Sequence, residues 1–198
     1  MSDRYQNFAQ LEASESRRGA FRTVVRTAPS DWIVVAPHGG GIEPGTSEIA
    51  RAVAGTEHSL YLFEGTKYSR NSALHITSTH FDDPALLLLL QRARRVITIH
   101  GCTGEEHAIV VGGRDDDSAD HILGVLRRSG VEAWRERGVS LRGTDPQNIC
   151  NRNQTGTGLQ LEFCEGLRSA MFDSLTRSGR SRTTSLFGTI IEAIRSSL

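Results

Sequence analysis

Runs of apolar residues recur along the chain and alternate with segments whose apolar residues are spaced as on one face of a helix. The runs predict strands at 20–26, 31–37, 59–65, 71–77, 95–100, 106–113, 139–142 and 158–163. The spaced segments predict helices at 1–18, 44–55, 82–92, 117–129, 166–176 and 186–194. Because strands and helices alternate, we expect an α/β fold with a mixed, mostly parallel sheet flanked by helices.

The helix predicted at 44–55 has recognisable signals at both ends. A hydroxyl of Thr46 or Ser47 is placed to cap its first turn, and Gly55 is placed to end it. The whole chain has 198 residues, which fits a single domain spanning 1–198. The polar segment 178–185 is then expected to link the body of that domain to a C-terminal helix.

The amino-acid composition argues against several classes of function. Lys plus Arg and Asp plus Glu both total 23, so the net charge is zero, and a general nucleic-acid binder is not expected. The longest apolar run, Ala85 to Leu90, is far shorter than a membrane span. The polar N-terminus resembles no signal peptide, and three cysteines without a CxxC pattern favour reduced thiols. We therefore expect a cytoplasmic monomer, or a phage enzyme that is released when its host lyses.

The first candidate site is the segment His38-Gly-Gly-Gly-Ile-Glu43. His38 follows a buried strand, and ligands bind beyond the carboxyl ends of parallel strands. The glycines let the backbone turn back, so that Glu43 approaches His38. Imidazole and carboxylate groups are zinc ligands. The alternatives are an ordinary glycine-rich turn or a phosphate-binding loop, although the segment lacks the Lys-Ser/Thr of a P-loop.

A second strand ends in the same way, with His100-Gly. If the two strands are near neighbours, the imidazoles of His38 and His100 converge at one edge of the sheet. With Glu43 they form a His₂Glu set, which is a ligand combination of catalytic zinc. A histidine that follows a strand is otherwise an ordinary structural residue.

A third candidate is Glu162, a glutamate within the apolar strand 158–163. Burying a carboxyl group is costly unless the group is paired or functional. Strand alternation places Gln160 and Glu162 on one face of the sheet. Glu162 is therefore a candidate general base, and a solvent-facing or salt-bridged glutamate is the alternative.

These motifs together resemble the poly-γ-glutamate hydrolase family. The resemblance rests on segments that occur in order between about residues 20 and 175: His38 to Glu48, Leu60 to Gly65, Leu74 to Pro84, His100-Gly, Asn148 to Arg152, and Gln160-Leu-Glu162. It implies a zinc carboxypeptidase-like fold, a Zn²⁺ ion held by His38, Glu43 and His100, and water activation by Glu162. The implied reaction is hydrolysis of γ-glutamyl amide bonds in poly-γ-glutamate.

Two departures from the carboxypeptidase pattern concern the site. The first ligand pair is H-x₄-E rather than H-x-x-E, and Asn151-Arg152, which resembles the carboxylate clamp of those enzymes, follows the second histidine rather than preceding it. Arg152 is a candidate for stabilising the oxyanion or for binding a substrate carboxylate, and Asn151 is a candidate for substrate binding.

Several further side chains are candidates at the site. His80 is a candidate for substrate binding, with a structural hydrogen bond as its alternative. Glu64 and Cys102 are rival ligands, and the role of His75 stays open. A polyanionic substrate also needs cations, for which loop residues Lys67, Arg70 and Arg114 are candidates.

The sequence thus predicts a zinc-dependent amidohydrolase that acts on poly-γ-glutamate. One alternative is a zinc amidase or peptidase of the same fold that acts on peptidoglycan peptides or N-acyl amino acids. The other is a binding module that holds an anionic polymer without turnover.

Overall fold

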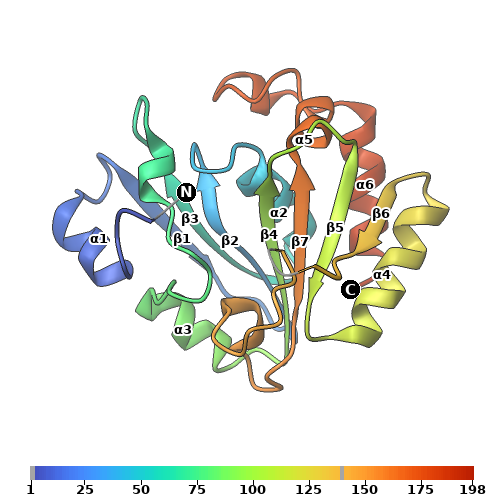
Figure 1. Cartoon of the computed structure of the whole chain (residues 1–198), viewed down its shortest axis with the longest axis horizontal. Coiled ribbons are helices and arrows are strands. Elements are labelled where there is room, and N and C mark those ends of the chain that lie inside the picture. Colours follow the sequence, from blue (N-terminus) through green and yellow to red (C-terminus); the bar gives the residue numbers. More distant parts are fainter. Residues whose placement is uncertain (1–2, 139–140) are drawn as a thin grey trace.

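A mixed β-sheet forms the centre of the molecule (Figure 1). The computed structural model describes residues 3–138 and 141–198, and within them seven strands form one sheet in the order β1-β3-β2-β4-β7-β5-β6. The strands are β1 Phe21–Arg26, β2 Trp32–Gly40, β3 Ser59–Gly65, β4 Arg95–Cys102, β5 Ala108–Gly113, β6 Glu132–Arg135 and β7 Leu159–Cys164. Strands β3, β2, β4 and β7 are mutually parallel, whereas β1 is antiparallel to β3 and β5 is antiparallel to β7.

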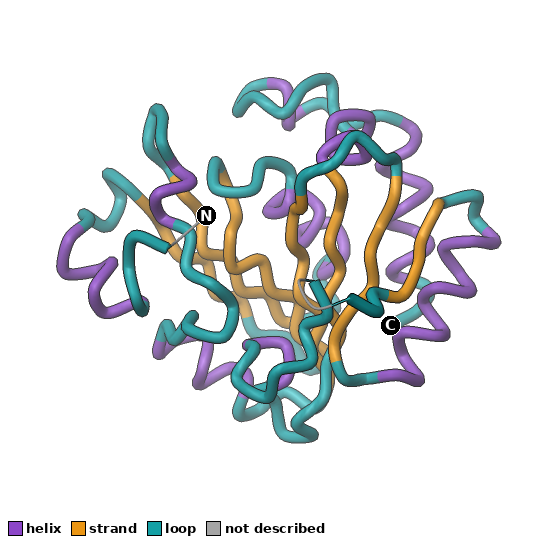
Figure 2. Tube along the Cα trace, viewed as in Figure 1, coloured by secondary structure: helices purple, strands orange, loops and turns teal. Residues whose placement is uncertain are grey.

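Helices cover both faces of this sheet. They are α1 Phe8–Ser14, α2 Thr46–Ala54, α3 Pro84–Leu90, α4 Asp116–Arg128, α5 Glu165–Met171 and α6 Ser185–Arg195, with short 3₁₀ helices at Asn71–Leu74, Ile149–Asn151 and Gly179–Ser181. One apolar cluster joins the sheet to α2, α4, α5 and α6, and a second joins the opposite face to α1 and α3. Figure 2 shows the helices at the periphery and the strands at the centre.

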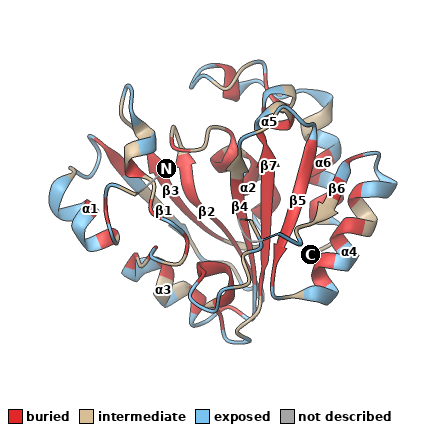
Figure 3. Ribbon diagram, in the orientation of Figure 1, coloured by how far each residue is buried: buried red, intermediate tan, exposed pale blue. Residues whose placement is uncertain are grey.

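The central strands are buried along almost their whole length (Figure 3). All six residues of β7 are buried, as expected for a strand covered on both faces. None of the helices in the described ranges has both the length and the apolar character needed to cross a membrane.

The predicted α/β fold with a mixed, mostly parallel sheet flanked by helices is confirmed. One strand prediction was wrong, because residues 71–74 form a 3₁₀ helix and 75–77 continue without regular structure. Strand β6 was missed, since it has only four residues and one of them, Glu132, is exposed. Part of the strand predicted at 139–142 lies outside the described residues, and Leu141 and Arg142 lie in a loop.

The start of α2 also differs from the prediction. Gly45, with φ of +103°, takes the cap position, and no side chain caps the helix. Thr46 Oγ1 instead donates to the carbonyl of Glu43 at 2.8 Å, and Ser47 Oγ accepts a hydrogen bond from the Gly40 amide at 2.9 Å. These hydroxyls therefore stabilise the turn that precedes the helix. In the segment predicted as a linker, Arg180 is buried and its Nε lies 3.0 Å from Glu48 Oε1 on α2.

Candidate metal centre

A β-bulge determines where the His38 side chain points. Ala36 pairs with Leu62 and Gly39 pairs with Glu64, so β2 contains one residue more than β3 over this stretch. The extra residue reverses the alternation of side chains. As a result His38 joins the face of the sheet that carries Ile33 and Val35 rather than the face that packs on α2.

The glycines after His38 allow the backbone to make this turn. A Cβ atom at Gly39 would collide with the hydroxyl of Ser47, and Gly40 has a φ of +66°, which favours glycine. The chain then folds back, and the Glu43 amide donates to the His38 carbonyl at 2.9 Å. The turn thereby brings Glu43 Oε1 to 3.0 Å from His38 Nδ1.

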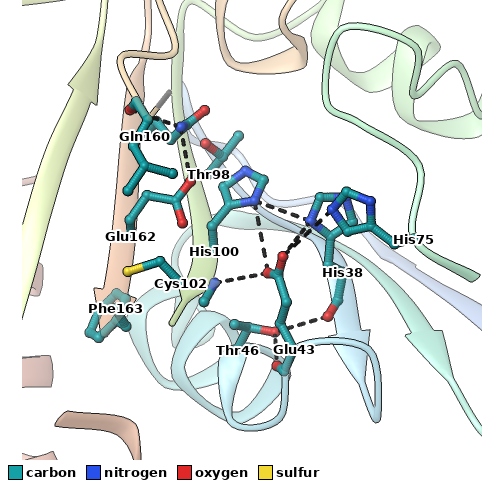
Figure 4. Close-up of polar contacts among 12 residues, drawn as sticks. His38, Glu43, Thr46, His75, Thr98, His100, Cys102, Gln160, Glu162 and Phe163 are labelled. Carbon is teal, nitrogen blue, oxygen red and sulfur yellow. Dashed lines mark hydrogen bonds and ion pairs between the residues drawn. The ribbon is translucent and has the colours of Figure 1, made fainter. Parts of the chain in front are cut away.

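His100 reaches the same point from the neighbouring strand β4 (Figure 4). Its Nδ1 lies 3.2 Å from His38 Nδ1 and 3.9 Å from Glu43 Oε2. The amide of Gly101 donates to Glu43 Oε2 at 2.8 Å, which orients the carboxylate. The structure therefore brings together the three side chains that the sequence analysis proposed as ligands.

The chemistry of these atoms fits a cation. His38 Nε2 donates to the Ile76 carbonyl at 2.8 Å, so in neutral His38 the lone pair is on Nδ1 and faces Glu43 and His100. Electron-rich atoms at 3.0 and 3.2 Å repel one another unless a proton or a metal ion lies among them. Ligands of a tetrahedral zinc ion lie about 3.3 Å apart, given zinc–ligand bonds of about 2.0–2.1 Å. The spacing in the site is close to that value.

The charges at this cluster are strongly coupled. Burial disfavours ionisation of Glu43, but the charge of His38 and its hydrogen bond outweigh burial and hold the pKa of Glu43 well below its usual value. Burial opposes protonation of His38 as well, yet Glu43 raises the pKa of His38. Burial lowers the pKa of His100 to about 3, so His100 is neutral at pH 7. The cluster thus presents one carboxylate and at least one neutral imidazole.

Glu162 lies beside this cluster on β7, where it is the register partner of His100. Its side chain is buried, and Gln160 Nε2 donates to its Oε1 at 3.0 Å. Burial, followed by the negative charge of Glu43, raises the pKa of Glu162 to about 8. A carboxyl group with this pKa can both accept and release a proton near neutral pH.

A fourth group, His75, completes the cluster from the other side. Its ring centroid is 4.0 Å from that of His38, and its Nε2 lies 3.8 Å from Glu43 Oε1. Its Nδ1 is 2.8 Å from Asp3 Oδ1, so the N-terminal segment orients this imidazole. His38, Glu43 and His75 are close enough to hold a metal ion together. Sequence reasoning left His75 without a role and missed Asp3.

The cluster opens into a cleft of about 800 Å³. His38, Glu43, His75, His100, Glu162 and the loop 141–145 are among the residues that line it. A volume in this range is typical of small-molecule and substrate sites. A substrate in the cleft can therefore reach both the cluster of His38, Glu43 and His100 and the carboxyl group of Glu162.

Comparison with known proteins assigns the chain to a family. The family model for poly-γ-glutamate hydrolase matches residues 5–193. The chain belongs to the poly-γ-glutamate hydrolase family. The sequence-based prediction of this family is thereby confirmed.

Individual members of the family are similar along most of the chain. The SPbeta prophage-derived UPF0714 protein YoqZ of Bacillus subtilis (strain 168) is 40% identical over 183 residues, which are 92% of this chain and 66% of YoqZ. The chain thus spans just under two thirds of that relative. A solved structure of a bacteriophage poly-γ-glutamate hydrolase has a TM-score of 0.95 and 34% identity, covering 99% of this chain and 96% of that chain. A zinc-free apo structure of YNDL has a TM-score of 0.94 and 38% identity, covering 99% and 97%.

Three residues that the sequence analysis proposed for the site do not line this cleft. Asn151, Arg152 and His80 are not among the described residues that line the cleft. Asn151 donates its side-chain amide to the carbonyls of Gly143 and Asp145 at 2.7 and 2.9 Å, so it holds the loop at the rim. His80 is exposed. Their predicted contacts with substrate stay predictions.

The structure also shows the contacts of the rival ligands and of the candidate cation Lys67. Glu64 is paired with Arg22 at 2.6 Å and Arg51 at 3.2 Å, which accounts for its burial. Cys102 lines the cleft, and its Sγ lies 3.6 Å from Cys164 Sγ. Lys67 pairs with Glu15 at 2.5 Å.

A buried arginine that sequence reasoning missed holds the base of the candidate site together. Arg168 on α5 donates to the carbonyls of Phe163, Pro44 and Cys102 at 3.0, 2.7 and 2.9 Å. Phe163 follows Glu162, Pro44 follows Glu43, and Cys102 is the last residue of β4. Arg168 therefore connects the three segments that carry the cluster.

Proposed function

We propose that the protein hydrolyses γ-glutamyl amide bonds in poly-γ-glutamate with a zinc ion held by His38, Glu43 and His100. The observation that carries this proposal is the close approach of His38 Nδ1, Glu43 Oε1 and His100 Nδ1, at 3.0 and 3.2 Å, beside buried Glu162. Membership of the poly-γ-glutamate hydrolase family supports the substrate class, and the name of the zinc-free YNDL structure supports the choice of metal.

The chain's own residues supply the remaining parts of the reaction. When bound, zinc lowers the pKa of water toward 7 and polarises a carbonyl group. Glu162 takes the proton of the attacking water and delivers it to the departing amine, for which its raised pKa suits it. The hydrogen bond from Gln160 fixes the orientation of Glu162 Oε1. Gly101 and Ile76 hold Glu43 and His38 in the orientation that metal binding requires.

Arg142 is a candidate contact for the substrate. It lies on the loop 141–145 and is the one arginine among the described residues that line the cleft. Its guanidinium can bind an α-carboxylate of the substrate in two-pronged fashion. Asn151 and Gln160 hold this loop through its backbone carbonyls, at Gly143 and Leu141. Stabilisation of the oxyanion by Arg152 and substrate contact by His80 stay predictions, as does the relation of the fold to zinc carboxypeptidases.

The experiment combines metal analysis with digestion of the polymer. We expect about one zinc ion per chain and shortening of poly-γ-glutamate on size analysis. His38→Ala is expected to lose both metal and activity, whereas Glu162→Gln is expected to keep the metal and lose turnover. Full activity of Glu162→Gln would contradict the role of this residue as the base.

A substrate panel separates the alternatives. Cleavage of muropeptides or N-acyl amino acids, with the γ-linked polymer left intact, would assign the chain to another amidase activity. Binding of the polymer without cleavage, in protein fully loaded with zinc, would indicate a binding module.

A further inference from the structure

A second cleft continues from the candidate metal centre along the sheet. It has a volume of about 590 Å³, and Arg142 and Thr144 line both clefts. Its other walls come from the end of β5, the end of β6 and the segment before β7, at Gly113, Arg135 and Thr157. The two clefts are therefore neighbours that share one arginine at their boundary.

The register of the sheet gives the direction and the length of this path. Glu162 pairs with Val110, and Leu159 pairs with Gly113. Three residues of strand span about 10 Å. A γ-linked glutamyl unit has five backbone atoms instead of three and extends roughly 6 Å, scaled from an ordinary residue. The second cleft therefore begins about two glutamyl units from Glu162.

The charge of the second cleft differs from that of the first. Four arginines line it, namely Arg114, Arg135, Arg137 and Arg142, against the two acids Asp116 and Glu136. In the first cleft the acids Glu43, Asp145 and Glu162 face only Arg142 among the described lining side chains with a permanent positive charge. Among the described lining side chains, arginines therefore outnumber acids in the second cleft, whereas acids outnumber arginines in the first. A polymer with one free carboxylate per unit is attracted to the excess of arginines in the second cleft.

The arginines of the second cleft are available for a ligand. Within the described residues, Arg114, Arg137 and Arg142 are exposed and their guanidinium groups make no hydrogen bond or ion pair with protein. Arg135 is held in place, since its Nη2 donates to the Gly113 carbonyl at 2.9 Å and to Asp116 at 2.6 Å. Its Nη1 is buried without a partner among the described residues. Because a buried guanidinium N–H without an acceptor is costly, an acceptor from a ligand would stabilise Arg135.

We propose that the second cleft binds the continuing chain of the polymer, with Arg114 and Arg137 binding the α-carboxylates of units beyond the scissile bond. This inference rests on the proposed function. A site that holds the chain on one side of the bond favours long substrates over short ones. It also makes the affinity for the polymer depend on salt, because exposed charge pairs are screened.

The test compares two double variants that lose the same charge. Arg114→Gln with Arg137→Gln removes two arginines of the second cleft. Arg92→Gln with Arg128→Gln removes two exposed arginines outside both clefts. Both are assayed at low and high salt with long poly-γ-glutamate and with a short γ-linked glutamyl peptide.

We expect the first double variant to raise KM for the long polymer about five- to tenfold at low salt, the effect of two exposed charge pairs. Its kcat, and its kcat/KM for the short peptide, should equal those of the wild type. High salt should reduce the difference in KM. The control variant should behave as the wild type. An unchanged KM for the polymer, or an equal rise in the control variant, would overturn the proposal.

A binding measurement keeps this test separate from the proposed activity. Fluorescence anisotropy of labelled poly-γ-glutamate is measured with chelated, inactive protein. If the wild type cleaves no γ-linked substrate, the proposed function fails, and weaker polymer binding by the first double variant still supports the second cleft. Equal binding of the polymer by both double variants overturns the proposal for the second cleft. The proposal is also overturned if single-stranded DNA binds as tightly as the polymer does.

Discussion

Replacing Glu162 by Gln tests the electrostatics of the site without reference to turnover. Glutamine has nearly the same shape as a protonated glutamic acid and cannot ionise. The folded pKa of Glu162 is raised from 4.5 to about 8, chiefly by burial. The folded state therefore resists ionisation of this carboxyl group. We predict that Glu162→Gln stabilises the metal-free protein at neutral and alkaline pH.

The size of the effect follows from the difference in pKa. A folded-state pKa above the unfolded value means that wild-type stability falls as pH rises from 4.5 to about 8 and then levels off. At about 1.4 kcal/mol per pH unit, ionisable Glu162 costs the folded state about 3 kcal/mol at pH 7. The cost reaches about 5 kcal/mol at pH 9 and disappears near pH 4.5.

The free energy of unfolding is measured by urea denaturation in the presence of a chelator, at about pH 5, 7 and 9. The control is Glu64→Gln, since Glu64 is also a buried glutamate on a strand. Burial raises the pKa of Glu64, but Arg22 and Arg51 outweigh burial and lower it. The control variant should therefore be less stable than the wild type at pH 7, with a deficit that shrinks as pH falls. A gain for Glu162→Gln that does not change with pH, or no gain at pH 9, would refute the reasoning.

Three further predictions concern the metal and its surroundings. In a competition titration, His100→Ala should weaken zinc binding by more than about a hundredfold, and His75→Ala by about ten- to a hundredfold, as is typical of a residue outside the ligand set. The reverse order would make His75 the third ligand. Chelation of bound zinc should lower Tm by about 10 °C in a thermal scan, whereas an unchanged Tm would mean that the folded state binds no zinc. Arg168→Met should lower the free energy of unfolding by about 3 kcal/mol or more, because three carbonyls lose their partner, and wild-type stability would contradict this role.

Most of the fold could be predicted because apolar patterning reports burial directly. Strand β2 begins with a continuous apolar run, β4 and β7 are largely apolar, and all three lie at the centre of the sheet. The segment 71–77 misled the analysis because Leu74 and Ile76 are both buried, as in a strand, although they belong to a 3₁₀ turn and its continuation. Strand β6 is too short to give a pattern.

The ligand cluster could be predicted in part because its signals are local. His38 and His100 both lie near the carboxyl ends of adjacent buried strands and precede glycine, so the strand order brings them to one edge of the sheet. Asp3 and His75 are 72 residues apart and carry no shared pattern. Arg168 lies in the helix predicted at 166–176 and belongs to no motif. Contacts of this kind depend on how loops and helices pack, which no short segment of sequence encodes.

Two glutamates show why a buried charge in a strand does not by itself mark a site. Glu64 and Glu162 both interrupt apolar strands, and both are buried. Two arginines neutralise Glu64, which lowers its pKa and makes it part of the structural framework. Among the residues that the structure describes, Glu162 has only the amide of Gln160 as a hydrogen-bond donor. Burial and the charge of Glu43 therefore raise its pKa. The raised pKa of Glu162 lowers the stability of the folded state at a position where the proposed chemistry needs a proton acceptor. The two residues therefore differ in their partners and not in their burial.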